Sequence, residues 1–199
     1  MELLLATRNA HKAREFAQIL GSQFQISDLS GSNVPSVQET GDTFEKNAVL
    51  KSVTVSLGRH LFVIADDSGL EVDALDGAPG IYSARYAGEN ASDEQNVEKL
   101  LRELAARNLA GAQRSARFRC VIALAREGKL LDTFEGIAEG AIVDLPRGKR
   151  GFGYDPIFRP NGFDKTFGEL PAEIKNRISH RAKAIAALRQ ALLEVKPKV

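Results

Sequence analysis

Residues 61–86, with the sequence LFVIADDSGLEVDALDGAPGIYSARY, decide the fold of this chain. The stretch opens on an apolar run, residues 61–65, whose length and branched side chains predict a buried strand. Four polar or small residues, 66–69, come next, and we expect a turn there because Gly69 frees the backbone. Two carboxylates, Asp66 and Asp67, thus follow a core strand, where open α/β sheets bind ligands.

The pair Asp66-Asp67 has two interpretations. Neighbouring residues on a strand point to opposite faces, so the two carboxylates are expected to have different roles. One of them can face a binding cleft while the other caps the turn. Alternatively, both serve only backbone N–H groups in an Asx-type turn. The local sequence does not decide between these interpretations.

The composition is that of an ordinary soluble protein. A chain of 199 residues with 43% hydrophobic and 27% charged residues suits one domain of one or two lobes. The formal net charge of +1 gives no overall attraction to nucleic acid or to a membrane surface. The single cysteine, Cys120, excludes an intrachain disulfide, and its strand-like surroundings predict a buried thiol. Without a signal peptide or a membrane-length apolar run, the expected location is the cytoplasm.

The first strand and helix are expected to flank a polar turn. Residues 3–6 are apolar, residues 7–12 are polar except for Ala10, and apolar residues at helical spacing then continue to a C-terminal cap at Gly21. Asn9 is a good N-cap, and the helix start with Lys12 can bind an anion. The ordinary interpretation, a capped helix with solvated Arg8 and Lys12, fits the same pattern.

A second helix is expected from a capping-box-like start at Asp42 to about Leu57. Lys51 lies on its apolar face, one turn after Asn47. Such a lysine can extend to solvent, or it can hold an ammonium group rigidly over a phosphate.

The rest of the chain alternates between strands and helices. A short strand is expected near residues 24–26, and Ser92 with Gln95 begins a helix. Residues 116–124 and 130–137 form the clearest hairpin. Ser179 is expected to cap the last helix, whose first turn holds His180 and Arg181. Two cations there oppose the helix dipole, and such local violations often mark function.

Residues 145–156 form the second informative stretch. Three basic residues and three glycines lead into two aromatic residues, Asp155 and a proline. Gly151 and Gly153 let the backbone approach a ligand, and Phe152 or Tyr154 could stack on a planar ring. The alternative is a basic solvent loop followed by a strand at residues 157–158.

Taken together, the chain resembles the inosine triphosphate pyrophosphatase (Ham1-like) family. The matching motifs run in family order from Ala6 to Arg181: ATRN at 6–9 with Lys12, ETG at 39–41, NA at 47–48 with Lys51, ADDSGL at 65–70, GIYSARY at 80–86, GFGYDP at 151–156, Lys175, and SHR at 179–181. The resemblance implies an α/β fold in which a long mixed β-sheet is flanked by helices. It also implies one domain over residues 1–199, with two lobes and the active site in the cleft between them.

The same resemblance implies the activity. Family members use Mg²⁺ to cleave ITP, dITP or XTP to the monophosphate and pyrophosphate, and they are homodimers. A nucleoside triphosphate carries about four negative charges, which magnesium and fixed cations must meet before water attacks phosphorus. The expected partner is therefore a small nucleotide, with no nucleic acid and no membrane.

The site residues are carried over by motif. Asp67 would take the proton of the attacking water and, with Glu39, hold magnesium. Ser68 would touch the substrate. The triphosphate would be bound by the first helix start and by Lys51 opposite it, with these residues at the helix start: Thr7, Arg8, Asn9, Ala10, His11 and Lys12. The purine base would be bound by Phe152, Gly153, Tyr154, Asp155, Lys175, His180 and Arg181. Arg8 stands where the family often has a small residue, and Gln38-Glu39 stands where two acids often occur.

Two alternatives have a basis in the sequence. The segment Arg150-Gly151-Phe152-Gly153-Tyr154 matches the first half of the RNP1 signature of RNA-recognition modules, although Asp155 and Pro156 interrupt the strand that the signature requires. A pyrophosphatase for other altered nucleotides would differ from the first interpretation only in its base pocket.

Overall fold

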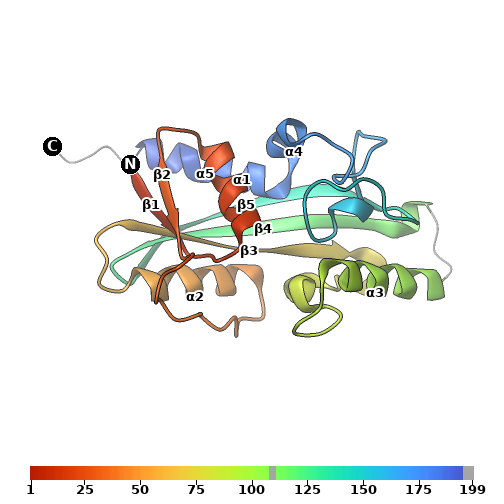
Figure 1. Cartoon of the computed structure of the whole chain (residues 1–199), viewed down its shortest axis with the longest axis horizontal. Helices are drawn as coiled ribbons and strands as arrows, with labels where there is room; N and C mark the ends of the chain where they lie inside the picture. The colour runs from red at the N-terminus through yellow and green to blue at the C-terminus, as the bar shows by residue number, and fades with distance from the viewer. Residues whose placement is uncertain (108–110, 195–199) are drawn as a thin grey trace. The chain divides into compact units, whose positions relative to one another are not determined.

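The computed structural model describes residues 1–107 and 111–194 and shows a mixed sheet with helices (Figure 1). The strand order is β2-β1-β3-β4-β5-β6, in which β1 pairs in parallel with β2 and β3, while β5 and β6 are antiparallel. The α/β class and the mixed sheet expected from the sequence are confirmed. The strands are β1 (Glu2–Leu5), β2 (Gln25–Asp28), β3 (Phe62–Val72), β4 (Ser115–Arg126), β5 (Lys129–Ile142) and β6 (Phe158–Pro160).

Within residues 1–107 and 111–194 the structure has five α-helices and four short 3₁₀ turns besides the strands. The helices are α1 (Ala10–Leu20), α2 (Phe44–Ser56), α3 (Asp93–Ala106), α4 (Ala172–Ile178) and α5 (His180–Glu194). The 3₁₀ turns are η1 (Asp73–Leu75), η2 (Gly80–Arg85), η3 (Gly111–Arg114) and η4 (Asp155–Ile157). No helix in the described part of the chain is long and apolar enough to cross a membrane.

The chain divides into two compact units. The first contains Met1–Asp67, Cys120–Gly136 and the chain from Arg181 onward, and the second contains Ser68–Arg119 and Ile137–His180. Each of the long strands β3, β4 and β5 has residues in both units. The expectation of an active site in a cleft between two lobes stays a prediction.

In the first unit, residues on β3 alternate between two cores. Ile64 packs with apolar side chains of α1 and α5, such as Phe16 and Leu188. Val63 and Ala65 pack in a separate cluster with Val55 of α2. Because side chains alternate along a strand, Asp66 continues the face of Ile64 and Asp67 continues the face of Ala65. The two neighbouring carboxylates therefore face different helices.

The second unit has its own core. Leu70 and Val72 at the end of β3 pack with Leu100 and Leu104 of α3. Three aromatic rings extend this cluster, with the centroids of Phe118 and Phe158 4.7 Å apart and those of Phe158 and Phe167 5.2 Å apart. Edge-to-face and tilted arrangements of this kind are the favoured ones for aromatic pairs.

The turn expected at residues 66–69 is wrong. β3 continues without interruption from Phe62 to Val72, and Gly69 is buried without a positive φ. Side chains from the neighbouring helices bind both carboxylates, so a backbone turn is not needed to satisfy them. An Asx-type turn at this point is excluded for the same reason.

Helix starts were better predicted than helix bounds. Asn9 caps α1, and Ser92 with Gln95 forms the capping box of α3, both as expected. The cap of α2 is Thr43 rather than Asp42, whose carboxylate instead pairs with the Lys46 ammonium. The hairpin of β4 and β5 is longer at both ends than expected, with Gly128 at its turn in the left-handed conformation that favours glycine.

The RNP1-like segment is not part of a strand. Arg150-Gly151-Phe152-Gly153-Tyr154 lies in bends and turns before β6. RNA-recognition modules stack bases on aromatic side chains that project from a sheet strand. This placement removes the basis for the RNA-binding alternative.

Candidate active site

The start of α1 is an ordered polar turn on the surface. The Asn9 Oδ1 atom accepts hydrogen bonds from the backbone N–H groups of His11 and Lys12, at 2.9 and 3.2 Å. The Thr7 Oγ1 atom accepts from the Asn9 N–H at 3.1 Å. Residues 8–11 are exposed, so the positive end of the helix dipole is open to an anion. The sequence prediction of an anion-binding helix start is compatible with this geometry.

Asp66 lies at the centre of a buried charge cluster. Its Oδ2 atom lies 3.1 Å from Lys12 Nζ of α1 and 3.2 Å from Arg181 Nη2 of α5. Arg181 also donates to Glu15 Oε2 at 2.6 Å. Burial by itself would raise the pKa of Asp66, but the charges of Lys12 and Arg181 hold this pKa far below its usual value. Asp66 is therefore a permanent anion that balances two cations.

Asp67 has different partners on the α2 side. Its Oδ2 atom accepts from Asn47 Nδ2 at 3.0 Å, and its Oδ1 atom lies 3.9 Å from Lys51 Nζ. Lys51 Nζ also lies 2.5 Å from Glu39 Oε1. Lys51 thus extends inward rather than to solvent, and Glu39, Asp67 and Asn47 converge on one place.

The environment of Asp67 makes it a proton acceptor near neutral pH. Burial raises the pKa of Asp67 to about 6; Lys51 opposes this shift and Glu39 adds to it. A general base works best when its pKa lies near the working pH. Asp66, with its strongly lowered pKa, has little affinity for a proton. Of the two neighbours, Asp67 has the properties of a base.

The donor set fits a loosely held Mg²⁺ ion rather than a closed metal cage. The described residues contain no group of three or more His, Cys, Asp or Glu side chains that could hold a metal. Glu39 and Asp67 supply two carboxylates that share Lys51. Magnesium is usually bound through one or two carboxylates together with substrate phosphates, and it keeps several waters. These two residues fit that pattern.

The second unit gathers part of the expected base pocket around Asp155. The Asp155 Oδ2 atom accepts from Lys175 Nζ at 2.6 Å and from the Phe152 N–H at 2.9 Å. Lys175 Nζ lies 5.0 Å from the centroid of the Phe152 ring. A Cβ atom at Gly151 would collide with the Asp155 carboxylate, so only glycine leaves room for this arrangement. Asp155 thereby connects Lys175 to the loop that carries Phe152.

Other expected base-pocket residues are buried in the same unit. The His180 ring stacks on Phe118 with centroids 4.7 Å apart. Tyr154 is 4% exposed, and its hydroxyl donates to the Ser83 carbonyl at 2.9 Å. Tyr154 is therefore a core residue, and Phe152, which is half-buried, is better placed to stack on a ring. Ser68 is also half-buried.

The structure divides the predicted site residues between the two units. The first unit contains the residues expected to bind the triphosphate, together with Glu39, Asp67 and Arg181. Ser68, His180, Lys175 and residues 152–155 belong to the second. Arg181, which was expected at the base, pairs with Glu15 and Asp66, and its contact with a base stays a prediction.

Sequence reasoning gave no role to two residues of these clusters. Glu15 belongs to none of the motifs, although it lies one turn after Lys12 in α1 and shares Arg181 with Asp66. Asn47 was noted only as the neighbour of Lys51. Glu15 is three residues from Lys12 and Asn47 is four residues from Lys51, so each shares a helix face with its lysine, and this spacing was the available signal for a shared role.

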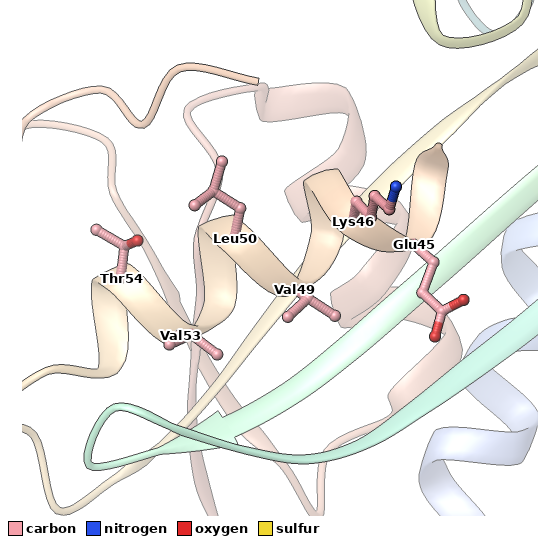
Figure 2. Close-up of a pocket in the computed structure, with 6 residues that line it drawn as sticks. All are labelled: Glu45, Lys46, Val49, Leu50, Val53 and Thr54. Atoms are coloured by element: carbon pink, nitrogen blue, oxygen red, sulfur yellow. The ribbon is translucent and has the colours of Figure 1, made fainter. Parts of the chain in front are cut away.

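The side of α2 that does not carry Asn47 and Lys51 is lined by aliphatic and charged residues and has no predicted site residue. Figure 2 shows the six residues that line a cavity of about 560 Å³ there: Glu45, Lys46, Val49, Leu50, Val53 and Thr54. Its lining is mostly aliphatic, and its one cation, Lys46, pairs with Asp42. None of the predicted site residues lines this cavity.

The fold and these clusters define an α/β protein in which one strand presents two acids to lysines on different helices. Comparison with known proteins shows its family. The family model described as the Ham1 family matches residues 3–191, and the chain belongs to this family.

Relatives match over nearly the whole chain. The dITP/XTP pyrophosphatase of Bacillus licheniformis is 48% identical over 195 residues, covering 97% of this chain and 98% of that protein. The dITP/XTP pyrophosphatase of Geobacter sulfurreducens is 50% identical over 192 residues, covering 96% of each. A HAM1 protein structure from Coxiella burnetii has a TM-score of 0.87 at 41% identity, covering 98% of this chain and 100% of that one. The Staphylococcus aureus Ham1 protein has a TM-score of 0.86 at 44% identity, with the same coverage.

Proposed function

We propose that this protein hydrolyses the non-standard purine nucleoside triphosphates ITP, dITP and XTP to the monophosphate and pyrophosphate, and so removes them from the nucleotide pool. The observation that carries the proposal is the contrast between Asp66 and Asp67. Asp67 has a pKa of about 6 beside Glu39 and Lys51, whereas Asp66 is held as a permanent anion. Relatives of similar length, matched end to end, are named dITP/XTP pyrophosphatases.

In this proposal the triphosphate binds at the start of α1 and at Lys51. Thr7, Asn9 and Lys12 supply polar groups at the positive end of the helix, and residues 8–11 present the surrounding backbone. Lys12 and Lys51 each hold a carboxylate when no substrate is bound. The same carboxylates hold the two ammonium groups in place for a phosphate.

Asp67 takes a proton from the water that attacks phosphorus. Asn47 donates to one oxygen of Asp67 and fixes the orientation of the carboxylate. Glu39 and Asp67 are the residues that would hold Mg²⁺, which when bound neutralises part of the phosphate charge. Lys51, between these two acids, supplies the fixed positive charge of the site.

Phe152, Lys175, His180 and Arg181 select the base in this proposal. Phe152 can stack on any purine, so discrimination has to come from the ring edge. Hypoxanthine and xanthine present an oxygen acceptor at position 6, where adenine presents an amino donor. Lys and Arg side chains carry donors only, which favours the 6-oxo purines.

Three finer points are included in the proposal. The protein acts with Mg²⁺, as a homodimer, and in the cytoplasm; the resemblance to the family supports all three. A pyrophosphatase for other altered nucleotides remains the second candidate, because the loop at residues 151–155 determines the base and the phosphate residues would be unchanged.

Product analysis tests the proposal. The purified protein is incubated with ITP and Mg²⁺, and the products are separated by anion-exchange chromatography. Pyrophosphate with IMP is the expected result, whereas orthophosphate with IDP would indicate an ordinary phosphatase. Hydrolysis in oxygen-18 water shows where attack occurs: label in the monophosphate means the α-phosphorus, and label in pyrophosphate means the β-phosphorus.

A further inference from the structure

The loop that carries Phe152 is tied to a helix distant in the sequence. The Gly153 N–H donates to the Asp93 Oδ2 atom at 2.6 Å, although the two residues are 60 positions apart. Asp93 is the first residue of α3, and Ser92 and Gln95 cap the helix at that point through reciprocal hydrogen bonds. The carboxylate of Asp93 is therefore held on a well-defined helix start.

Two carboxylates hold the two consecutive backbone amides at Phe152. The Phe152 N–H donates to Asp155, and the next N–H, of Gly153, donates to Asp93. Charge-assisted hydrogen bonds of this kind are short and directional. Together they fix the peptide planes on either side of the Phe152 Cα atom, and so the direction in which its side chain leaves the backbone.

Packing alone does not fix this loop on the side of α3. A cavity of about 650 Å³ lies there, with Val97 and Leu101 of α3 and Pro146, Phe152 and Pro156 among its lining residues. The Phe152 loop therefore has space to move toward α3 when the bond to Asp93 is absent.

From these contacts we propose that Asp93 is a positioning residue for the purine ring. It acts through Gly153 to hold Phe152 in the orientation that stacks on the base. The inference rests on the proposed function, because it takes Phe152 as the stacking residue. It assigns to α3 a role in base binding, whereas the proton-accepting Asp67 belongs to the other unit.

Three variants separate positioning from a general effect on the helix. Asp93→Ala removes the acceptor, and Asp93→Asn keeps a side-chain oxygen that can accept the same bond. Glu94→Ala is the matched control, because Glu94 is also an exposed acid in the first turn of α3. Both alanine variants lose one carboxylate at the helix start, and so lose a similar interaction with the helix dipole.

Steady-state kinetics with ITP and Mg²⁺ provide the first readout. Asp93→Ala is expected to raise KM for ITP about tenfold, the equivalent of one hydrogen bond to a charged group, with kcat within about twofold of wild type. Glu94→Ala is expected to keep the wild-type KM, and Asp93→Asn is expected to raise KM less than Asp93→Ala does, because the amide oxygen accepts the same bond without a charge. An unchanged KM in Asp93→Ala, or an equal rise in Glu94→Ala, would overturn the inference.

Amide hydrogen exchange provides a readout that does not depend on activity. The segment around Gly153 is expected to exchange faster in Asp93→Ala than in wild type, and at the wild-type rate in Glu94→Ala. Equal exchange in all proteins would show that Asp93 does not hold the loop. If wild type released no pyrophosphate from ITP, the proposed function would fail, and the exchange data would still decide whether Asp93 holds Gly153.

Discussion

Asp66 and Asp67 are neighbours on one strand, yet their carboxylates lie on opposite faces of the sheet and their pKa values shift in opposite directions. Asp66 faces α1 and α5, where Lys12 and Arg181 neutralise it. Asp67 faces α2, where burial and Glu39 favour its protonated form against the effect of Lys51. Strand alternation thus gives two identical side chains different chemistry: Asp66 is held as an anion between two cations, and Asp67 has a raised pKa.

Substitution of Asp66 and of Asp67 by asparagine should therefore affect the stability of the fold differently. Asp66→Asn removes the buried charge that Lys12 and Arg181 share and leaves Arg181 with Glu15 alone, and we expect a loss of about 3 kcal/mol in the free energy of unfolding. Asp67→Asn removes a charge that is costly to bury, and we expect the protein to be at least as stable as wild type at pH 7.5. Urea unfolding with a chelator present measures both.

The activity of the same variants completes the comparison. Asp67→Asn should lower kcat for ITP by about 100-fold or more, because the proton acceptor is lost. If a folded Asp67→Asn protein kept more than about a tenth of the wild-type kcat, Asp67 would not be the base.

The stability of the metal-free protein should depend on pH through Asp67. The pKa of Asp67 is about 6 in the folded protein, above its unfolded value, so the folded state binds more protons in between. Stability contributed by this group is present below about pH 4 and is lost as pH rises toward 6. The difference in unfolding free energy between wild type and Asp67→Asn should therefore decrease from pH 4 to 6 and level off above pH 7. A difference that is constant over this range would show that the pKa of Asp67 is not raised.

Much of the architecture was predictable because it depends on local pattern. The caps at Asn9 and Ser92 and the hairpin around Gly128 follow from single residues at fixed offsets, and the structure has all three. The continuation of β3 through Asp66 and Asp67 was not predictable. It depends on cations from α1, α2 and α5, and a local window contains no information about those partners.

The site was predictable to a similar degree. Lys51 could be assigned to an apolar helix face because it recurs at helical spacing with Phe44, Ala48 and Val55, and it does extend toward Asp67. The roles of Arg181 and Asp155 were harder, because each has an acidic or basic partner far away in the sequence. A cation in the first turn of α5 opposes the helix dipole, and the structure explains how Arg181 is tolerated there. Asp66 and Glu15 compensate its charge.

Activity should be far more sensitive to loss of Lys12 or Lys51, the two lysines of the proposed phosphate site, than to loss of lysines elsewhere. Lys12→Ala and Lys51→Ala should each lower kcat/KM for ITP by about 100-fold, because each removes a fixed charge at the triphosphate. Lys46→Ala, on the exposed side of α2, and Lys129→Ala, at the hairpin turn, should keep wild-type activity. Equal behaviour of all four variants would mean that the triphosphate binds elsewhere.

Base selectivity should depend on Lys175 and Arg181. A donor left unpaired against adenine in a partly desolvated pocket costs about 1–3 kcal/mol, so rejection of ATP by two to four orders of magnitude in kcat/KM is expected. Lys175→Ala should narrow the ITP/ATP ratio mainly by lowering ITP turnover, and Arg181→Lys should do so while keeping a charge beside Asp66. Arg177→Ala, an exposed change on the same helix as Lys175, is the control and should leave the ratio unchanged. Competition between ITP and ATP in one reaction measures the ratio directly. A Lys175 or Arg181 variant with full ITP activity and full rejection of ATP would exclude that residue from the base pocket.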